Sequence, residues 1–326
     1  MKAVPLVIAL LKAEPVILYY ACGGGLGHVT RAAAILRHLK PDIMVLVLTS
    51  VAEPYPLIHE GIPFRYIAPD EYFSNTVIDF VSNSHLRVLL MDVFPLGLRA
   101  ELTEIIPKLA CKKVFIYRHV RADYRPTITS ALPYFDQVIF AETADPPLPV
   151  ETIACQPILL REGHELRSRD SARQILGVTS DVPVVLGVSS TDDRWTKSFF
   201  PILRKALLFT GISAHLSLAA PGYTGEGAVD YYPLLELLPG VDVVVGAGGY
   251  NLYHEVHSCG VPAIFLPQPR TVDDQHWRTQ SATTACSPEE LEARLREALL
   301  SPRIPTIFSN NAITAVDVLS PPGYIW

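Results

Sequence analysis

The chain has 326 residues, of which 49% are hydrophobic and 18% are charged, and its formal net charge at pH 7 is −6. This length suits two domains, and this composition excludes an intrinsically disordered protein. The acidic balance gives no general electrostatic reason to bind nucleic acid, so we expect no nucleic-acid partner.

The N-terminal segment Met1–Ala13 carries Lys2 and then an apolar run that is too short to span a bilayer. A signal peptide is the alternative, but a strand and a glycine loop that a folded domain needs follow at once. The cysteines are odd in number and widely spaced, as in a reducing compartment. They are Cys22, Cys111, Cys155, Cys259 and Cys286. We therefore expect a cytoplasmic protein, and a position at the inner face of the membrane stays open.

In the first half, short apolar runs bounded by Gly, Pro and Asp alternate with helical patterns. Such runs are typical of strands in a mostly parallel sheet, and the apolar spacing in His28–Lys40 predicts a helix. The predicted strands are Val16–Ala21, Ile43–Leu48, Val88–Leu90, Val114–Tyr117 and Gln137–Phe140.

The second half repeats the alternation. Its predicted strands are Val184–Val188, Ala214–Leu218, Val241–Val245 and Ala263–Leu266, and its predicted helices are Ser198–Leu208, Leu252–Cys259 and Pro288–Leu300. Strands that alternate with helices in both halves predict an α/β protein with two Rossmann-like, doubly wound parallel-sheet domains.

A Pro-rich stretch without periodicity, Asp145–Arg161, predicts a linker between the two domains. We place an N-terminal domain at residues 1–155 and a C-terminal domain at residues 156–326, with a return of the last residues to the N-terminal domain left open. Ligands of such sheets bind at the carboxyl ends of the strands, so we expect the two domains to face each other across a cleft that holds the site.

The first glycine loop, residues 23–27, lies between a predicted strand and a predicted helix that starts at His28. Glycines there let a ligand approach the backbone, and the helix N-terminus favours an anion. A dinucleotide site would need a glycine in place of His28 and an acidic residue in place of Thr49-Ser50, which disfavours a nicotinamide or flavin enzyme. The helix dipole keeps a histidine at this position neutral, so His28 is a candidate base. A histidine that only caps the loop is the alternative.

The second glycine loop, Gly246-Ala247-Gly248-Gly249, precedes a helix that Gly260 and Pro262 end. Glu255 lies at the edge of the apolar stripe of this helix, where a carboxylate needs hydrogen-bond donors. Ribose hydroxyls would supply them, and nearby backbone or an arginine is the alternative. His254 and His257 lack the spacing of a zinc helix and no Asp-x-Asp occurs, so we expect no metal site.

Polar segments follow two other strands of the second half. Ser189-Ser190-Thr191 would offer donors to a phosphate, although Ser and Thr clusters are ordinary in loops. Gln275, in the polar segment Pro267–Trp277, can donate and accept hydrogen bonds at once, which suits sugar hydroxyls.

Together these segments resemble glycosyltransferases of the type B fold. The likeness rests on GGGLGHVTR (residues 23–31), GAGGYNLYHE (246–255), CGVPAIFLPQ (259–268) and DDQHW (273–277). It is closest to the branch with the bacterial transferase that adds N-acetylglucosamine to the lipid-linked peptidoglycan precursor. The segment Asp92–Leu102 also resembles a motif of uncharacterised transferases in that branch.

This resemblance implies an inverting, metal-independent transfer of a hexose or N-acetylhexosamine from a nucleotide sugar to a hydroxyl acceptor, with UDP the expected nucleotide and no cofactor. His28 would be the catalytic base. The implied nucleotide-sugar-binding residues are Gly25, Gly27, Ser189, Gly248, Gly249, Glu255 and Gln275, and the implied acceptor residues are Asp92 and Arg99.

The sequence departs from the family where GVSST replaces a more glycine-rich turn and where Asp274 replaces a common second glutamine. The acceptor is open: a sugar, a small molecule, or a lipid-linked molecule held on apolar residues between Pro54 and Phe73 with peripheral membrane contact. A nucleotide-sugar hydrolase that uses His28 on water, a sugar-nucleotide 2-epimerase and a non-catalytic binding protein are the alternatives.

Overall fold

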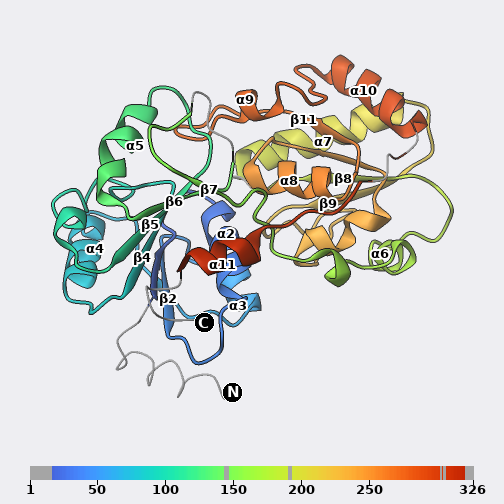
Figure 1. Ribbon diagram of the computed structural model, residues 1–326. Coiled ribbons are helices and arrows are strands. Elements are labelled where there is room, and N and C mark those ends of the chain that lie inside the picture. Colours follow the sequence, from blue (N-terminus) through green and yellow to red (C-terminus); the bar gives the residue numbers. More distant parts are fainter. Residues whose placement is uncertain (1–16, 143–146, 190–192, 302, 304–305, 320–326) are drawn as a thin grey trace. The chain divides into compact units, whose positions relative to one another are not determined.

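The computed structural model describes residues 17–142, 147–189, 193–301, 303 and 306–319 (Figure 1). The chain forms two compact units: the first is Met1–Leu160 with Asn311–Trp326, and the second is Arg161–Asn310. The chain therefore passes between the units twice, after Leu160 and after Asn310. The division expected from the sequence, between residues 155 and 156, lies in the same Pro-rich stretch.

The first unit is built on a parallel sheet of seven strands in the order β3-β2-β1-β4-β5-β6-β7. Its strands are β1 (Ile17–Tyr20), β2 (Val45–Thr49), β3 (Phe64–Tyr66), β4 (Val88–Asp92), β5 (Lys112–Tyr117), β6 (Gln137–Phe140) and β7 (Ile153–Ala154). The first six follow the strand order of a dinucleotide-binding Rossmann sheet. The order reverses between β1 and β4, where Tyr20 pairs with Met91.

Burial along the strands explains why β1 and β4 lie at the centre of this sheet. Every residue of both strands is buried, which is typical of strands covered on both faces, whereas Arg65 and Tyr66 of the edge strand β3 are exposed. The helices of this unit are α2 (Gly27–Leu36), α3 (Tyr55–His59), α4 (Phe73–Ser82), α5 (Arg125–Ala131) and α11 (Ala312–Leu319), with 3-10 turns η1 (Ile106–Lys108) and η2 (Leu132–Tyr134).

Helix α11 fixes the returning end of the chain to the first unit. It packs against α2, and Lys112 Nζ donates a hydrogen bond of 2.6 Å to the carbonyl of Val318. Four of the five buried residues of α11 are Ala or Val, so the helix approaches its neighbours closely.

The second unit has a parallel sheet of four strands in the order β11-β10-β8-β9. The strands are β8 (Val184–Val188), β9 (His215–Ala219), β10 (Val243–Gly246) and β11 (Ala263–Phe265). Here the order reverses between β8 and β10. The other elements are α6 (Arg169–Ile175), α7 (Asp193–Phe209), α8 (Tyr250–Ser258), α9 (Gln275–Thr279) and α10 (Pro288–Leu300), with 3-10 turns η3 (Gly163–Glu165) and η4 (Leu234–Gly240).

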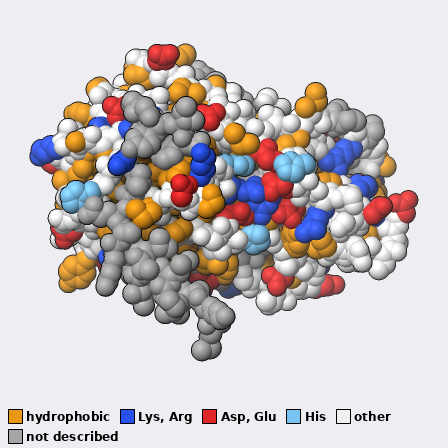
Figure 2. Space-filling model, turned by 60° about the horizontal axis from the view of Figure 1, so that its bottom comes forward, with side chains coloured by type: hydrophobic (Ala, Val, Ile, Leu, Met, Phe, Trp, Pro, Cys, Tyr) orange, Lys and Arg blue, Asp and Glu red, His pale blue; other side chains and the backbone are white. Residues whose placement is uncertain are grey.

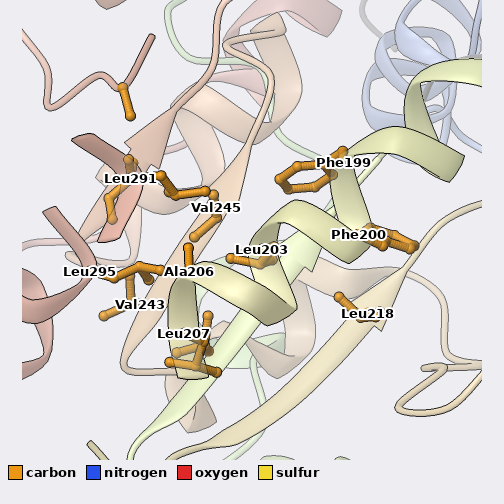
Figure 3. Close-up of a cluster of buried hydrophobic side chains, with 13 residues drawn as sticks. Phe199, Phe200, Leu203, Ala206, Leu207, Leu218, Val243, Val245, Leu291 and Leu295 are labelled. Atoms are coloured by element: carbon orange, nitrogen blue, oxygen red, sulfur yellow. The ribbon is translucent and has the colours of Figure 1, made fainter. Parts of the chain in front are cut away.

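The core of the second unit lies between this sheet and the helices α7 and α10 (Figure 3). Phe199, Leu203 and Leu207 project from α7, and Leu291 and Leu295 project from α10. Each of these side chains is at most 7% exposed. Removing one such leucine would cost about 2–5 kcal/mol of stability, so this layer anchors the strands whose ends carry the polar loops.

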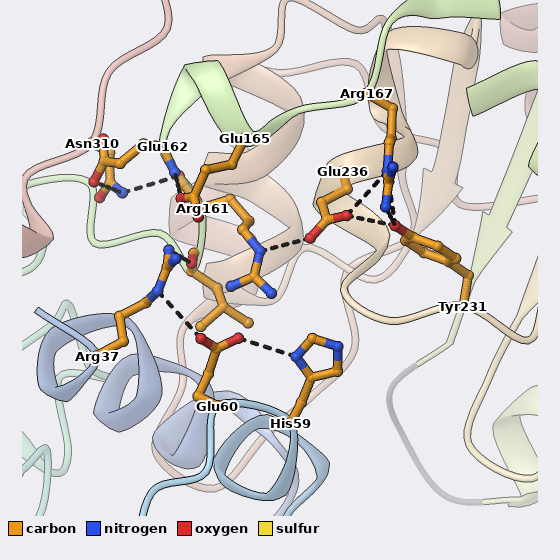
Figure 4. Close-up of polar contacts among 11 residues, drawn as sticks. Arg37, His59, Glu60, Arg161, Glu162, Glu165, Arg167, Tyr231, Glu236 and Asn310 are labelled. Carbon is orange, nitrogen blue, oxygen red and sulfur yellow. Dashed lines mark hydrogen bonds and ion pairs between the residues drawn. The ribbon is translucent and has the colours of Figure 1, made fainter. Parts of the chain in front are cut away.

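The chain passes from the first unit to the second between Leu160 and Arg161, and an arginine fixes the backbone or begins an ion pair on each side of this junction (Figure 4). In the first unit, Arg37 donates to the carbonyl of Leu160 at 2.6 Å and pairs with Glu60 at 3.3 Å. In the second unit, Arg161 pairs with Glu236 at 2.7 Å. Because Arg161 and Glu236 are both buried, this pair costs desolvation and favours one conformation at the start of the unit.

The structure confirms the predicted fold class of two Rossmann-like parallel-sheet units and differs from the sequence in some elements. The short strands β3 and β7 were not predicted, because three and two residues carry too little alternation to stand out. Helix α2 ends at Leu36, one turn before the predicted end at Lys40. Helix α7 begins at Asp193, before the predicted Ser198, and continues through Pro201.

Two observations concern the surface and possible membrane-spanning segments. Figure 2 shows acidic and basic side chains interspersed on the face it presents, with hydrophobic side chains among them. Within the part of the chain that the structure describes, no helix is both long enough and apolar enough to cross a membrane.

Candidate functional site

In the first unit, two polar segments meet where the strand order reverses. Strand β1 leads into the first glycine loop and helix α2, and the neighbouring strand β4 ends at Asp92. Because the two strands are parallel neighbours, their carboxyl ends lie at the same edge of the sheet. This edge, at the reversal of strand order, is where doubly wound sheets bind ligands.

His28, Arg31 and Asp92 form a buried polar cluster at this edge. His28 Nδ1 lies 3.3 Å from Asp92 Oδ2. Arg31 holds the same carboxylate with one edge of its guanidinium group: Nε donates at 3.2 Å, and Nη2 donates at 3.0 and 2.9 Å. The three side chains are 6%, 1% and 0% exposed. At this distance and orientation Nδ1 of His28 makes no regular hydrogen bond to Asp92, so the contact is an electrostatic one.

The protonation states follow from burial and from these contacts. Burial lowers the pKa of His28 below its ordinary value of 6.5, although the nearby Asp92 carboxylate acts in the opposite direction. Burial alone would raise the pKa of Asp92, but the Arg31 guanidinium and His28 outweigh it and hold this pKa below its usual value. At pH 7 the site therefore contains a neutral imidazole beside an ionised carboxylate.

The imidazole of His28 is held on two other sides. Its ring stacks on Phe94, with centroids 5.4 Å apart and planes inclined by 28°. On another side, a Cβ added to Gly23 would lie 2.6 Å from Cδ2 and Nε2 of the ring, so only glycine fits there. Ser50 in turn fixes Gly23, since its hydroxyl accepts from Gly23 N at 3.0 Å and donates to Gly23 O at 3.1 Å.

A strained residue follows Asp92. Val93 has a φ of 67°, a conformation that β-branched residues rarely adopt. Its side chain is fully buried, and its N–H donates to the carbonyl of Ile116 at 3.0 Å. The turn lets Asp92 reach His28 Nδ1 while Phe94 reaches the face of the same ring. Strain of this kind gathers at functional sites, which supports this edge of the sheet as one.

The structure places the predicted residues of the first unit as follows. His28 is the second residue of α2, Gly27 is the first, and Gly25 is exposed with a φ of 86°. Arg99 is exposed, and its guanidinium donates to the carbonyls of Pro69 and Asp70, both at 2.6 Å. These contacts show Arg99 tying two loops together.

The contact between Asp92 and His28 was missed by the sequence analysis, as was Arg31. Two signals were present: His28 and Arg31 are three residues apart on one helix face, and Asp92 ends a buried strand. Only the adjacency of β1 and β4 joins them, and the sequence does not reveal strand order.

In the second unit, the second glycine loop also lies where the strand order reverses. It leaves β10, the neighbour of β8, and Gly249 is the N-cap of α8. Arg278, which is 3% exposed, donates to the carbonyl of Gly248 at 3.0 Å and pairs with Asp273 at 2.8 Å. Arg278 thus fixes the loop from α9, a role that the sequence gave no reason to expect.

Glu255 lies on α8 and is the most strongly perturbed carboxylate of this region. Burial raises the pKa of Glu255 from its ordinary value of 4.5 to about 7. Within the described part of the chain, no residue donates a hydrogen bond or an ion pair to its carboxylate. A partly buried carboxylate without a donor is costly, and a ligand with hydroxyl groups would remove that cost.

Gln275 and Ser189 are more engaged with the protein than the sequence suggested. The amide oxygen of Gln275 accepts from Gln268 N at 2.9 Å, and its amide nitrogen donates to Asp273 at 3.3 Å. Ser189 Oγ lies 2.6 Å from Thr196 Oγ1, and Ser189 N donates to the carbonyl of Ala219. Gln275 would therefore meet a ligand through its second N–H. Ser189 directs its N–H into the protein, and its hydroxyl is engaged with that of Thr196. Ser190 and Thr191 lie outside the described residues.

The two histidines of α8 take part in ring contacts. His254 packs against Tyr250 with centroids 4.5 Å apart, and His257 packs against Tyr253 at 4.1 Å. Among the described residues, no group of three His, Cys, Asp or Glu side chains is arranged to hold a metal ion.

A substitution at Gly248 tests how closely α9 supports the glycine loop. A Cβ there would lie 2.3 Å from Thr279 Cγ2, so we expect Gly248→Ala to lower the free energy of unfolding by about 1–3 kcal/mol. Thr279→Ser removes that methyl group and should restore most of the loss in the double variant. Urea unfolding followed by tryptophan fluorescence reports mainly on this unit, which contains two of the three tryptophans, Trp195 and Trp277.

Gly249→Ala is the matched control, because the nearest atom to its Cβ would be Gln275 Nε2 at 3.8 Å. It should change the free energy of unfolding by no more than about 1 kcal/mol, the cost of a poorer N-cap. Equal losses in Gly248→Ala with and without Thr279→Ser would contradict the predicted contact.

The pKa of Glu255 predicts a pH-dependent gain in stability for Glu255→Gln. The folded-state pKa of about 7 exceeds the ordinary 4.5, so ionisation of Glu255 costs folding stability as the pH rises through this interval. Above pH 7 the cost is complete, and at about 1.4 kcal/mol per pKa unit it reaches about 3 kcal/mol. Urea unfolding should show Glu255→Gln to be more stable than the wild type at pH 8.

The difference should shrink to a few tenths of a kcal/mol near pH 4.5, because the Glu255 carboxyl is then protonated in the folded state and only about half ionised in the unfolded state. Glu104→Gln is the control for removal of a carboxylate, because the Glu104 side chain is 84% exposed. A Glu255→Gln variant with unchanged stability at pH 8 would show that the carboxylate has a donor after all.

Comparison with known proteins gives matches of structure and none of sequence. No protein-family model matches the chain, and no curated protein matches it. The MurG structure from Acinetobacter baumannii is 14% identical and superposes with a TM-score of 0.58 over 94% of this chain and 99% of that one.

Two further structures are similar over most of their length. A spinosyn rhamnosyltransferase, SpnG, complexed with thymidine diphosphate is 11% identical, with a TM-score of 0.62 over 93% of this chain and 94% of that one. A transferase from Siraitia grosvenorii in complex with UDP is 15% identical, with a TM-score of 0.53 over 93% of both chains. Identities this low show the fold, and the chain therefore has the type B fold of glycosyltransferases.

Proposed function

We propose that the protein is an inverting, metal-independent glycosyltransferase that moves a hexose or N-acetylhexosamine from a nucleotide sugar to a hydroxyl acceptor. The observation that carries the proposal is the neutral His28 imidazole, held by Asp92 at a strand-order reversal and next to a glycine loop. The fold supports the choice of reaction class, because the solved structures it resembles include glycosyltransferases.

His28 has the properties of a general base. Because Nδ1 lies 3.3 Å from the Asp92 carboxylate, the negative charge favours the tautomer with the proton on Nδ1, which leaves Nε2 to accept one. In the proposed reaction, Nε2 takes the proton of the acceptor hydroxyl while the acceptor oxygen bonds to the anomeric carbon. The bond from that carbon to the nucleoside diphosphate breaks with inversion, and the diphosphate leaves with the electron pair.

Asp92 acts in this scheme as a positioning residue. It is fully buried, and its carboxylate is occupied by Arg31 and His28, so we assign it to the base and not to the acceptor. A fixed carboxylate holds the imidazole in one tautomer and stabilises the imidazolium that forms. Arg99 is likewise a loop-bridging residue in this proposal.

Binding of the donor falls to the second unit. The N-terminus of α8, with Gly248 and Gly249, presents backbone N–H groups and a positive dipole end to the diphosphate. Glu255, one turn into the helix, would accept from the ribose hydroxyls, and the remaining N–H of Gln275 would reach the sugar. Gly25 and Gly27 would let the first loop approach the sugar or its diphosphate. We leave Ser189 out of the proposed site.

UDP is the donor nucleotide we expect, and thymidine diphosphate (dTDP) is the main alternative. Both occur in the similar structures, one in the rhamnosyltransferase SpnG and one in the transferase from Siraitia grosvenorii. Calorimetric titration with UDP and with dTDP decides between them. Glu255→Ala should weaken the binding of either by more than about tenfold, the value of one lost charge-assisted hydrogen bond.

Gly23→Ala tests the role of His28 without changing the histidine. The new Cβ would lie 2.6 Å from the imidazole and must displace it, so we expect turnover to fall by about 100-fold or more. The measurement is the initial rate of nucleoside diphosphate release, compared with that of His28→Ala. Gly24→Ala is the control, since its Cβ would have no atom within 4 Å and should leave the rate within a factor of about three. Similar losses in both alanine variants would count against the proposed base.

Product analysis separates transfer from hydrolysis. The protein should release nucleoside diphosphate from UDP-glucose or UDP-N-acetylglucosamine only with an acceptor extract of cell lipids and metabolites, and mass spectrometry should find the glycosylated product. Rapid release of free sugar without acceptor, abolished by His28→Ala, would instead establish a hydrolase. Binding of UDP-sugars without turnover in any extract would favour a non-catalytic protein.

A further inference from the structure

A cavity of about 180 Å³ lies at the amino-terminal edge of the second sheet. Its walls include Asp181–Pro183, which leads into β8, and Asp242, which leads into β10. Arg169 at the start of α6, the last turn of α10 and Arg303 also line it. Because β8 and β10 are parallel, their amino ends share this edge, whereas the second glycine loop leaves β10 at the opposite edge. The cavity is therefore separate from the site described above.

Two arginine side chains share one carboxylate at this edge. Arg169 Nη2 donates to Asp242 Oδ1 at 2.7 Å, and Arg173 Nη1 donates to Asp242 Oδ2 at 3.5 Å. The same Oδ2 accepts from Val184 N at 2.8 Å. The single negative charge of Asp242 is thus already divided between two cations, and it cannot neutralise another one nearby.

Arg303 is such a further cation. Its guanidinium donates to three backbone carbonyls, at 3.2 Å to Gly260, at 3.1 Å to Pro239 and at 2.5 Å to Cys259. Within the described part of the chain, no Asp or Glu lies within ion-pair distance of it. Burial is the main cause of a lowered pKa of Arg303. A partly buried cation without a counter-charge is costly, and a bound anion would remove that cost.

Arg169 and Arg303 meet at one acceptor. Nη1 of each donates to the carbonyl of Pro239, at 3.3 and 3.1 Å, so the two positive charges lie close together. Neither guanidinium uses all of its N–H groups in its contacts with the described residues. Converging guanidinium groups with N–H groups to spare are suited to a phosphate or carboxylate group.

The cavity is also lined by apolar side chains, which favour an organic anion over an inorganic one. They are Val182, Pro183, Ala298 and Leu299. A volume of about 180 Å³ equals that of about six water molecules in the liquid, so only a short ligand fits. One charge opposes an anion, because Asp181 is exposed and lines the same cavity.

We propose that this cavity is a separate ligand site, which binds a small organic anion with its phosphate or carboxylate group between Arg169 and Arg303. The ligand supplies the counter-charge that Arg303 lacks, and its apolar body lies against Pro183 and Leu299. The inference does not rest on the proposed function, because it concerns the other edge of the sheet and requires no transfer reaction.

Phenyl phosphate is the probe, because it joins a phosphate group to a small apolar ring. Calorimetric titration of the full chain is carried out with saturating UDP, which keeps the proposed diphosphate site occupied. Phenyl phosphate should bind at a single site, and inorganic phosphate, which lacks the ring, should bind at least about threefold more weakly. Benzyl alcohol, which is similar in size and neutral, should not bind. No binding of phenyl phosphate, or equal binding of benzyl alcohol, would overturn the proposal.

Two variants of opposite sign assign the binding to the cavity. Arg169→Gln keeps a donor for Asp242 and removes the charge, so phenyl phosphate should bind about tenfold more weakly. Asp181→Asn removes the opposing charge and should tighten binding by about two- to fivefold. A loss of folding could not produce both changes. Unchanged affinity in Arg169→Gln would place the probe elsewhere and contradict the inference.

Arg296→Gln is the matched control. The Arg296 side chain is 51% exposed, close to the 46% of Arg169, and it likewise contacts one carboxylate, that of Glu292, and one carbonyl, that of Phe209. It is not one of the described residues that line the cavity. The affinity for phenyl phosphate should stay within a factor of about two. Equal losses in both arginine variants would reveal a general charge effect and no site.

Vesicles distinguish the two sources of such an anion, a lipid headgroup and a soluble compound. The full chain is sedimented with phosphatidylcholine vesicles that contain phosphatidic acid. Sedimentation that phenyl phosphate reverses, and that Arg169→Gln lacks, would assign the site to a lipid phosphate. Without sedimentation, the binding of phenyl phosphate supports a soluble anion.

Discussion

The buried contact of Arg31 with Asp92 is the constraint on which the first unit depends. It joins helix α2 to the end of strand β4 and places the imidazole of His28 against the same carboxylate. A buried ion pair of this kind contributes little net stability, because both ions lose their hydration. Its value lies in geometry, because it gives the carboxylate beside His28 one position.

The same topological device appears in both units. Each sheet reverses its strand order at one place, between β1 and β4 in the first unit and between β8 and β10 in the second. Each glycine loop leaves a strand at such a reversal, and an arginine supports the polar groups there. In the first unit Arg31 binds a carboxylate, and in the second Arg278 binds the carbonyl of the glycine loop. In both units, therefore, the polar site lies where the strand order of the parallel sheet reverses.

Much of this arrangement was predictable from sequence because it depends on local patterns. The strands around the two glycine loops, the loops themselves and helix α10 (Pro288–Leu300) were placed correctly or within a few residues. The contact of Asp92 with His28 was not found, since it depends on which strands are neighbours and on the left-handed backbone of Val93. The hydrogen bond between the hydroxyls of Ser189 and Thr196 could not be predicted from the sequence either, because both residues are of types that are ordinary in loops and at helix starts.

Val93 shows how the geometry of the proposed base can be tuned separately from the stability of the fold. Its left-handed backbone costs about 1–3 kcal/mol, and burial of its side chain returns about as much. A glycine at this position would lose both contributions, so the two residues would be nearly interchangeable by the measure of stability alone. They differ in the mobility of the backbone turn, because the valine side chain packs in the core, whereas a glycine would let Asp92 and Phe94 move. A Val93→Gly change would therefore leave the melting temperature nearly unchanged, and its effect would be seen only in the rate of the proposed reaction.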